Sequence, residues 1–233
     1  ARNLYALQEV SLTHRAQLDL RPDSRPFILS RSGYPGIQRY AANWSGDTLT
    51  SFDSLRVNIQ TSISMGLSGQ NQFGHDVRGF LGAPSAELFT RWLQFASLTT
   101  YFRTHSVHVV PHREPWRFGE PWTGINRKAI EQRYRWMPYL YTLHEEASRT
   151  GAPVLAPTFF HFPGDPGTVA QDTEYMLGTS LLVAPVHVEG ATTRSAYLPS
   201  GTGWIDVATG TAYAWRPCTA STPAPTPSCW PPP

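Results

Sequence analysis

The chain has 233 residues, of which 40 % are hydrophobic, 12 % aromatic and 15 % charged, and its formal net charge is +2. This composition supports a folded core and excludes a fully disordered chain, and the small net charge excludes a broad basic field for nucleic acid. No run approaches 18 apolar residues, so we expect no membrane partner. Both cysteines, Cys218 and Cys229, lie in the last sixteen residues, which excludes a disulfide framework for the main body.

Short apolar runs alternate with amphipathic stretches through the first 150 residues. The predicted strands are 25–32, one within 66–76, and 99–105, and the predicted helices are 51–65, 84–98 and 122–148. Gly66 is expected to end the first of these helices. The last helix carries Ile130, Tyr134, Met137 and Tyr141 on one stripe. Strands alternating with helices predict a parallel sheet covered by helices.

The pattern changes after Gly151. Short β-prone runs at 154–162, 180–188, 193–198 and 204–207 are divided by Gly and Pro, which predicts an antiparallel sandwich. Asp165 and Asp172 are interpreted as solvated turn residues. Residues 217–233 contain seven prolines and no charge, which predicts a disordered tail. A competing hypothesis is that this tail is read in the wrong frame, which resequencing would decide.

Polar residues cluster where the predicted strands end. In α/β barrels, side chains at the carboxyl ends of the strands line the active site. Two carboxylates, two arginines and a histidine beside a tryptophan suit a neutral polyol, because these groups exchange hydrogen bonds with hydroxyls while the ring packs on the sugar. The residues are Arg31, Trp44, Asp47, Asp76, Arg103 and His105.

Seven segments, in this order, resemble glycoside hydrolase family 31, the α-glucosidase family. They are RPFILSRS (25–32), RYAANWSGD (39–47), GHDVRGF (74–80), FRTH (102–105), REPW (113–116), RYRWMPYLY (133–141) and LGTSLLVAP (177–185). The resemblance covers about residues 1–210. It implies an α/β fold in which residues 1–150 form the C-terminal half of a (β/α)₈ TIM barrel. A small antiparallel β-sandwich domain would follow over 151–216, and then the Pro-rich tail over 217–233.

The resemblance also implies roles for the clustered residues. Asp47 matches the catalytic general acid/base of the family, and the substrate-binding residues would be Arg31, Trp44, Asp76, Arg103 and His105. The substrate would be an α-glucoside oligosaccharide, with no cofactor and no metal. The family retains anomeric configuration, which requires two carboxylates about 5–5.5 Å apart.

The family's nucleophile lies in a Trp-x-Asp-Met-Asn-Glu segment, which these 233 residues do not contain. We therefore expect a fragment that is inactive alone and needs the missing N-terminal half of the barrel as its partner. No secretory signal is visible, which favours the cytoplasm.

Several alternatives stay open. The chain could be a carbohydrate-binding or scaffold module, an α-xylosidase or transglucosidase of the same family, or a non-functional product. His105, His108 and His112 have a loose metal-ligand spacing, but extended chain would not place them on one face. Arg31 could simply form a salt bridge with Asp47 or Asp76.

Two departures from the family pattern bear on the site. The usual Gly-Gly-Phe is here Arg78-Gly79-Phe80, and three amides, Gln70-Asn71-Gln72, stand where a barrel strand is normally apolar. A buried amide without partners would cost about 1–3 kcal/mol.

Overall fold

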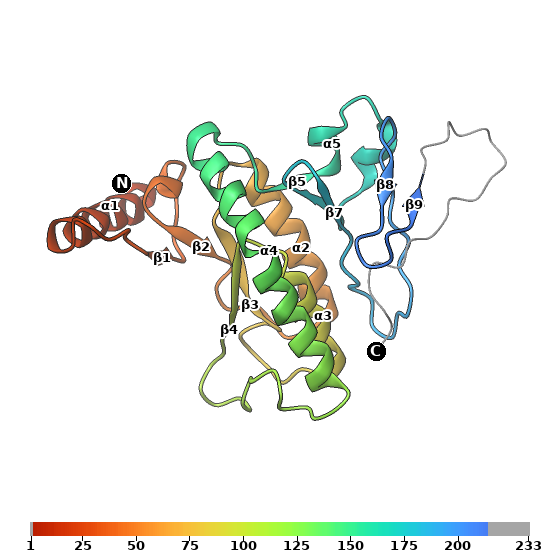
Figure 1. Ribbon diagram of the computed structural model, residues 1–233. Helices are drawn as coiled ribbons and strands as arrows, with labels where there is room; N and C mark the ends of the chain where they lie inside the picture. The colour runs from red at the N-terminus through yellow and green to blue at the C-terminus, as the bar shows by residue number, and fades with distance from the viewer. Residues whose placement is uncertain (1, 214–233) are drawn as a thin grey trace.

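A computed structural model describes residues 2–213 (Figure 1). Both cysteines and the expected Pro-rich tail lie outside the described residues. The helices are α1 (Arg2–Leu20), α2 (Phe52–Leu67), α3 (Ala86–Ala96), α4 (Trp122–Thr150) and α5 (Thr158–His161), with two 3₁₀ helices, η1 (Ile37–Arg39) and η2 (Pro166–Ala170). The strands are β1 (Leu29–Ser30), β2 (Ala42–Trp44), β3 (Phe73–Val77), β4 (Tyr101–Thr104), β5 (Leu155–Pro157), β6 (Tyr175–Leu177), β7 (Leu181–Val183), β8 (Trp204–Ile205) and β9 (Ala212–Tyr213). No described helix is both long and apolar enough to cross a bilayer.

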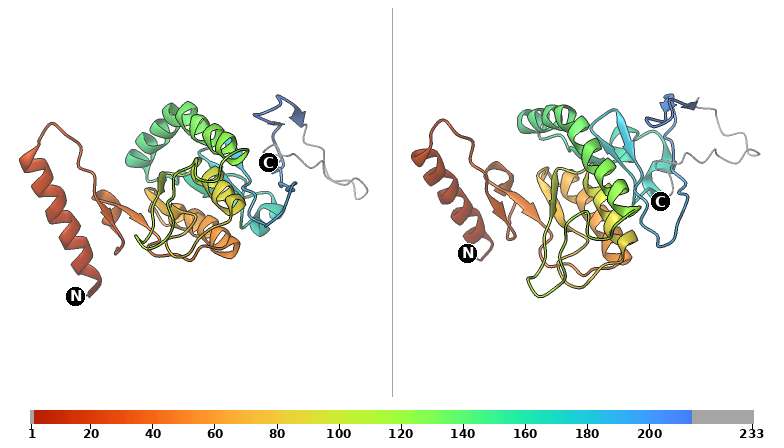
Figure 2. Two further views of the ribbon diagram at one scale, coloured as in Figure 1. Left: turned by 90° about the horizontal axis from the view of Figure 1, so that it is seen from below. Right: turned by 60° about the horizontal axis from the view of Figure 1, so that its bottom comes forward.

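The first four strands form one parallel sheet in the order β1-β2-β3-β4. Helices α2 and α3 pack against β3, and α3 also packs against α4. Helix α1 contacts η1 and stands away from the other helices in every view (Figures 1 and 2). Parallel strands covered by helices confirm the expected α/β class.

Helices α2 and α3 begin as the sequence predicts. Ser51 and Ser85 are their N-cap residues, and each side chain accepts a hydrogen bond from the backbone N–H three residues later. Leu55, Ile59 and Ile63 of α2 are buried in the core, as their helical spacing requires. The expectation that Gly66 ends α2 is wrong, because the helix continues to Leu67.

Gly66 is instead a contact point between α2 and β5. A Cβ atom at Gly66 would overlap the carbonyl oxygen of Leu155. The glycine is therefore needed for the close approach of the two backbones rather than as a helix terminator.

Of the stripe expected on α4, Ile130 packs against the core, while Met137 is exposed. Tyr134 and Tyr141 are exposed, and the buried residues of this helix are instead Asn126, Ala129, Leu140 and Leu143. Helix α1 and the short strands β2, β6 and β9 were not predicted from the sequence.

After α4 the chain forms two small antiparallel sheets, β5-β6-β7 and β8-β9. These sheets confirm the small antiparallel β region, but with shorter strands than expected. The run over 154–162 turns into helix α5 after Pro157, and residues 193–198 form no strand. The expectation of a solvated Asp165 is wrong, since its buried carboxylate accepts hydrogen bonds from Tyr197 Oη and the Ser200 N–H.

One hydrophobic core serves both parts of the chain. It contains Leu55 and Trp92 from the helices beside the parallel sheet together with Leu155 and Leu177 from the first antiparallel sheet. Tyr175 Oη, also buried, donates a hydrogen bond to the Leu98 carbonyl across this boundary.

Asn71 joins the two parts through its amide. The side-chain Nδ2 donates to the Ala152 carbonyl at 2.9 Å, and the Oδ1 accepts from the Val154 N–H at 2.9 Å. Both polar atoms of this amide are therefore satisfied, and Asn71 lies before β3 rather than in it, so the cost expected for a buried amide does not arise.

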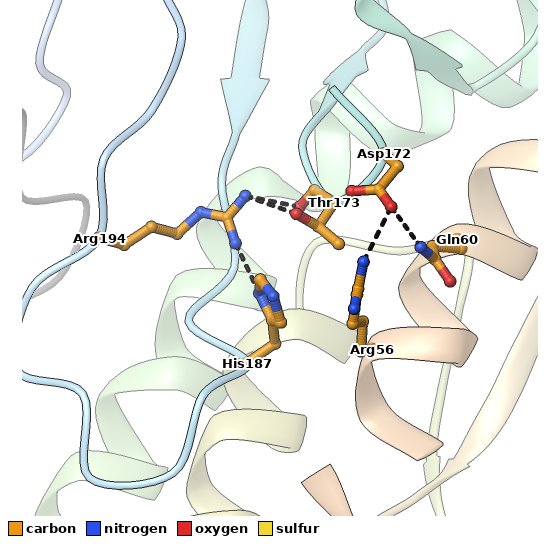
Figure 3. A network of polar contacts seen from close by, with 6 residues as sticks. All are labelled: Arg56, Gln60, Asp172, Thr173, His187 and Arg194. Carbon is orange, nitrogen blue, oxygen red and sulfur yellow. Dashed lines mark hydrogen bonds and ion pairs between the residues drawn. The ribbon is translucent and has the colours of Figure 1, made fainter. Parts of the chain in front are cut away.

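A polar network fastens α2 to the segment after η2 (Figure 3). Asp172 Oδ2 accepts hydrogen bonds from Arg56 Nη2 at 3.2 Å and from Gln60 Nε2 at 2.5 Å, two residues one turn apart on α2. Asp172 is exposed, as the sequence predicts, and it also links the two parts of the chain.

Arg194 forms the second half of the network in Figure 3. Its Nη2 donates to the backbone and side-chain oxygens of Thr173, and its Nη1 lies 2.6 Å from Nδ1 of His187. A guanidinium can only donate, so Nδ1 accepts and His187 is neutral here. Arg194 Nη1 also donates to the Pro185 carbonyl at 2.7 Å. Burial lowers the pKa of His187, and the charges of Arg194 and Arg56 lower it further.

We expect Gly66→Ala to lower the free energy of unfolding by about 1–3 kcal/mol, because the added methyl group pushes α2 away from β5. Urea denaturation followed by tryptophan fluorescence measures the loss. Gly164→Ala is the matched control, since a Cβ there meets no atom within 4 Å. Equal stabilities of the two variants would contradict the close packing of α2 on β5.

The neutral His187 makes stability depend on pH. The unfolded chain binds a proton at this histidine below pH 6.5 while the folded chain resists it, so the free energy of unfolding falls as the pH drops below 6.5. We expect His187→Gln, which can still accept from Arg194, to lose about 1 kcal/mol less than the wild type between pH 6.5 and pH 5. Denaturation curves at pH 5, 6.5 and 8 test this, and parallel profiles for the two proteins would refute it.

Candidate active site

The candidate site residues lie along the carboxyl edge of the parallel sheet. Arg31 directly follows β1, Trp44 ends β2, Asp76 lies in β3, and Arg103 lies in β4. Because the four strands run in the same direction, their carboxyl ends share one edge. The structure therefore brings these side chains to the region that the sequence predicts.

Asp76 and Arg103 form a buried ion pair. The strand register pairs the two residues directly, which places both side chains on the same face of the sheet. Arg103 Nη2 and Nε lie 2.7 and 2.8 Å from Asp76 Oδ1. The Asp76 side chain is 0 % exposed and that of Arg103 is 28 % exposed. Among the described residues, Asp76 Oδ2 has no hydrogen-bond partner, which leaves an acceptor at this face.

Two aromatic rings hold the Arg103 guanidinium in place. Its central carbon lies 5.4 Å from the ring centre of Trp44 and 5.3 Å from that of Tyr101. The sequence analysis did not single out Tyr101, although the two-residue alternation of a strand places it on the same face as Arg103. Burial raises the pKa of Tyr101, the charge of Arg103 lowers it in part, and Asp76 raises it.

Asp47 lies in the loop after β2 and is paired with Arg31. The distance from Arg31 Nη1 to Asp47 Oδ2 is 3.5 Å, and the two side chains are 59 % and 43 % exposed. Gly46 has a φ of 73°, and a Cβ there would overlap the Arg31 guanidinium. The Ser-Gly-Asp turn therefore needs its glycine both for its backbone conformation and for the approach of Arg31. The salt bridge fixes Asp47 while leaving it open to solvent.

His105 follows β4 directly and is exposed. Its ring lies 5.4 Å from the ring centre of Phe80, and its carbonyl accepts a hydrogen bond from Arg113 Nη1 at 2.8 Å. No hydrogen bond or ion pair joins its imidazole to Asp47 or Asp76 within residues 2–213. His105 is therefore at the same edge but is held through Phe80 and Arg113.

Arg113 connects the loops that follow β3 and β4. Besides the His105 carbonyl, its buried guanidinium donates to the carbonyls of Gly79, Phe80 and Gly82. No ion pair joins Arg113 to its neighbour Glu114 within residues 2–213. The Glu114 carboxylate lies 3.7 Å from His112 Nδ1 instead.

The candidate residues line one hollow only in part. This hollow, of about 330 Å³, is lined by Arg31 and Trp44 together with Tyr34, Met65 and Phe73 and their neighbours. A larger one of about 480 Å³ lies between α1 and η1 and contains none of the candidate residues. Neither of these hollows is lined by Asp47, Asp76, Arg103 or His105.

A family model described as the glycosyl hydrolases family 31 TIM-barrel domain matches residues 1–143, and the family 31 C-terminal domain matches residues 151–230. Alpha-glucosidase 2 of Bacillus thermoamyloliquefaciens is 41 % identical over 208 residues, which are 89 % of this chain and 26 % of that protein. The probable glucan 1,3-alpha-glucosidase of Arabidopsis thaliana is 44 % identical over 81 % of this chain and 20 % of its own length.

Solved structures of glycosidases are also similar to this chain. The glucosidase II alpha subunit superimposes with a TM-score of 0.87 at 31 % identity, over 90 % of this chain and 23 % of that one. A dextranase of Flavobacterium johnsoniae bound to glucose superimposes with a TM-score of 0.85 at 33 % identity, over 91 % of this chain and 27 % of its own. The chain therefore spans about a quarter of the length of the proteins that it matches.

The two carboxylates should differ in their importance for stability. We expect Asp76→Asn to lower the free energy of unfolding by about 2–4 kcal/mol, because it leaves Arg103 without its buried counter-charge. Asp47→Asn removes the same charge from an exposed ion pair, so it should lower the free energy of unfolding by less than about 1 kcal/mol. Urea denaturation of both variants measures the difference, and similar losses would mean that the Asp76–Arg103 pair is not a buried support of the sheet.

Proposed function

The chain belongs to glycosyl hydrolase family 31, and we propose that it contributes the acid/base side of an active site that hydrolyses α-linked glucosides. The observation that carries this proposal is the row of polar side chains at the carboxyl edge of the sheet. There, Asp47 is paired with Arg31, and Asp76 with Arg103. Such an edge is the functional end of a barrel.

Asp47 is suited to proton transfer by its surroundings. Its side chain is half-exposed, so a glycosidic oxygen can reach it, and Arg31 holds it in one place. In the proposed reaction Asp47 protonates the departing glycosidic oxygen. It then removes a proton from the water that attacks the glycosyl-enzyme ester, so configuration is retained.

Asp76, Trp44 and Arg103 are suited to holding the sugar. Asp76 is buried and holds Arg103, whose side chain is 28 % exposed, so the donors of the guanidinium are the part of this pair that a sugar hydroxyl can reach. The Trp44 ring lies against the same guanidinium and would form the wall of the subsite. We assign Arg31, Arg103 and His105 to the same subsite, His105 at its rim because its ring lies against Phe80.

The reaction needs a second carboxylate about 5–5.5 Å from Asp47 to form the ester. The Trp-x-Asp-Met-Asn-Glu segment that would supply it is absent from these 233 residues. We therefore propose that residues 1–150 supply half of the barrel and that the nucleophile comes from a complementary half outside this sequence. Residues 151–216 would form the β domain that follows.

The 233-residue chain alone should not hydrolyse nitrophenyl α-glucoside or nitrophenyl α-xyloside, because the ester cannot form without the nucleophile. Release of nitrophenol by wild type and by Asp47→Asn, measured side by side, should equal the buffer rate. The proposal would be overturned if the wild type hydrolysed either substrate and Asp47→Asn did not. That result would show that the 233 residues hold a complete active site with its own nucleophile. Faster release from the xyloside would identify an α-xylosidase.

Maltose calorimetry separates this proposal from a carbohydrate-binding module. If the site holds a sugar through Arg103, which Asp76 positions, Asp76→Ala should weaken maltose binding about tenfold, because a hydrogen bond from a charged group is lost. A carbohydrate-binding module would still bind maltose in Asp47→Ala and Asp76→Ala. It would lose maltose binding in Trp116→Ala, because Trp116 is 67 % exposed.

A further inference from the structure

The turn that carries Asp47 is hydrogen-bonded to the loop that follows β3, which we define as residues 78–82. Thr48, the residue after Asp47, is the centre of this contact. Its carbonyl accepts from the N–H groups of Phe80 and Leu81, at 2.8 and 3.0 Å. The location of Asp47 therefore depends on where the loop 78–82 lies.

The loop 78–82 also packs closely against the segment that follows Asp47. Leu49 and Leu81 form a parallel bridge. Gly79 has a φ of 80°, and a Cβ there would overlap the Leu49 carbonyl oxygen. The two segments are in contact along their backbones, so a shift of the loop 78–82 moves the turn of Asp47 with it.

Arg113 holds the loop 78–82 against β4. Its buried guanidinium donates to three carbonyls of this loop, those of Gly79, Phe80 and Gly82. It also donates at 2.8 Å to the carbonyl of His105, the residue that follows β4. The planar fork of an arginine presents several donors in fixed directions, so one side chain can bind two loops at once.

Arg78 makes the reverse connection. It is the first residue of the loop 78–82, and its Nη2 donates to the carbonyls of Pro111 at 3.1 Å and His112 at 3.5 Å, just before Arg113. Arg78 is 0 % exposed and has a φ of 74°, a conformation that is strained for a residue with a side chain. Such strain persists only where the surrounding contacts hold it, and it is frequent beside functional sites. The two loops thus hold each other through one arginine from each.

We propose that Arg113 is a positioning residue for Asp47, and that Arg78 holds the segment that carries Arg113. The Arg113 guanidinium fixes the carbonyls of the loop 78–82 relative to β4, and N–H groups of the same loop fix the Thr48 carbonyl. Thr48 in turn fixes Asp47, its neighbour in the chain. Within residues 2–213 neither arginine forms an ion pair with the Asp47 carboxylate, so both act through the backbone.

The role of Arg113 in catalysis rests on the proposed function, because it matters there only if Asp47 transfers a proton. An acid/base must lie within hydrogen-bond distance of the oxygen that it protonates, and a misplacement of about 1 Å can cost about 100-fold in rate. The pair between Asp47 and Arg31 is exposed and contributes little energy. The backbone contacts of Thr48 therefore supply the support that the exposed pair lacks.

The test compares the wild-type chain with Arg113→Lys. Lysine keeps the charge, but its single ammonium group cannot replace the four contacts on two loops. Amide hydrogen exchange of Phe80 and Leu81, relative to amides that exchange only by global unfolding, should become about tenfold faster, because hydrogen bonds from a charged group are lost. The carboxyl ¹³C resonance of Asp47, assigned by its absence in Asp47→Asn, should shift as the carboxylate changes its place beside Arg31. A role in overall stability alone would change neither readout.

Arg133→Lys is the matched control. Arg133 donates to the carbonyls of Ser97 and Thr99, which precede β4 at the edge of the sheet opposite the site. The variant therefore loses the same kind of contact far from Asp47. It should lower the free energy of unfolding while leaving both readouts at their wild-type values.

Arg78→Gly tests the second arginine. Glycine adopts a φ of 74° without strain, so the backbone is kept while the contacts to the two loop carbonyls are lost. Both readouts should change in the same direction as in Arg113→Lys, with the exchange faster by about threefold.

An unchanged value of either readout in Arg113→Lys would overturn the proposal. Equal changes in Arg133→Lys would also overturn it, because they would show an effect of overall stability. If Arg113→Lys does not fold, Arg78→Gly decides by the same two readouts. None of these measurements uses a sugar, so a failure of the maltose experiment would count against the proposed function alone.

Discussion

The buried ion pair between Asp76 and Arg103 is the interaction on which the arrangement of the site depends. A carboxylate withdrawn from water is stable only if a cation is held against it in fixed geometry. The direct pairing of the two residues across β3 and β4 provides that geometry, and the rings of Trp44 and Tyr101 confine the guanidinium from the other sides. The Arg103 guanidinium on β4 thus contacts side chains of both β2 and β3, so one charge holds three neighbouring strands together.

The pair formed by Arg31 and Asp47 has a different physical character. Both side chains remain partly in solvent, so the pair contributes little to stability but keeps the carboxyl group available for exchange with a substrate. The sheet edge therefore separates a rigid, buried carboxylate from an accessible one. Arg113 completes this arrangement by fastening the loop after β3 to the loop after β4 through backbone carbonyls.

Local sequence patterns predicted the parts of the fold that depend on interactions between residues close together in the sequence. Ser51 and Ser85 start helices because their side chains cap the first turn, and polar residues at strand ends meet because parallel strands share an edge. The predictions that were wrong concern residues whose roles depend on contacts with distant parts of the sequence. Asp165 is satisfied by Tyr197 and Ser200, more than thirty residues later, and no local pattern records those partners. The same holds for Gly66, whose role becomes visible only when Leu155 lies against it.

The hydrophobic core that runs from α2 and α3 into the sheet β5-β6-β7 has a consequence for how the molecule comes apart. Leu155 and Leu177 share their packing with Leu55 and Trp92, so neither part retains a sealed interior when the other opens. Heat or denaturant should melt both in a single cooperative step rather than in two. A protease that cuts the connection after α4 would therefore release no independently folded piece, and the boundary visible in the topology is not a boundary of stability.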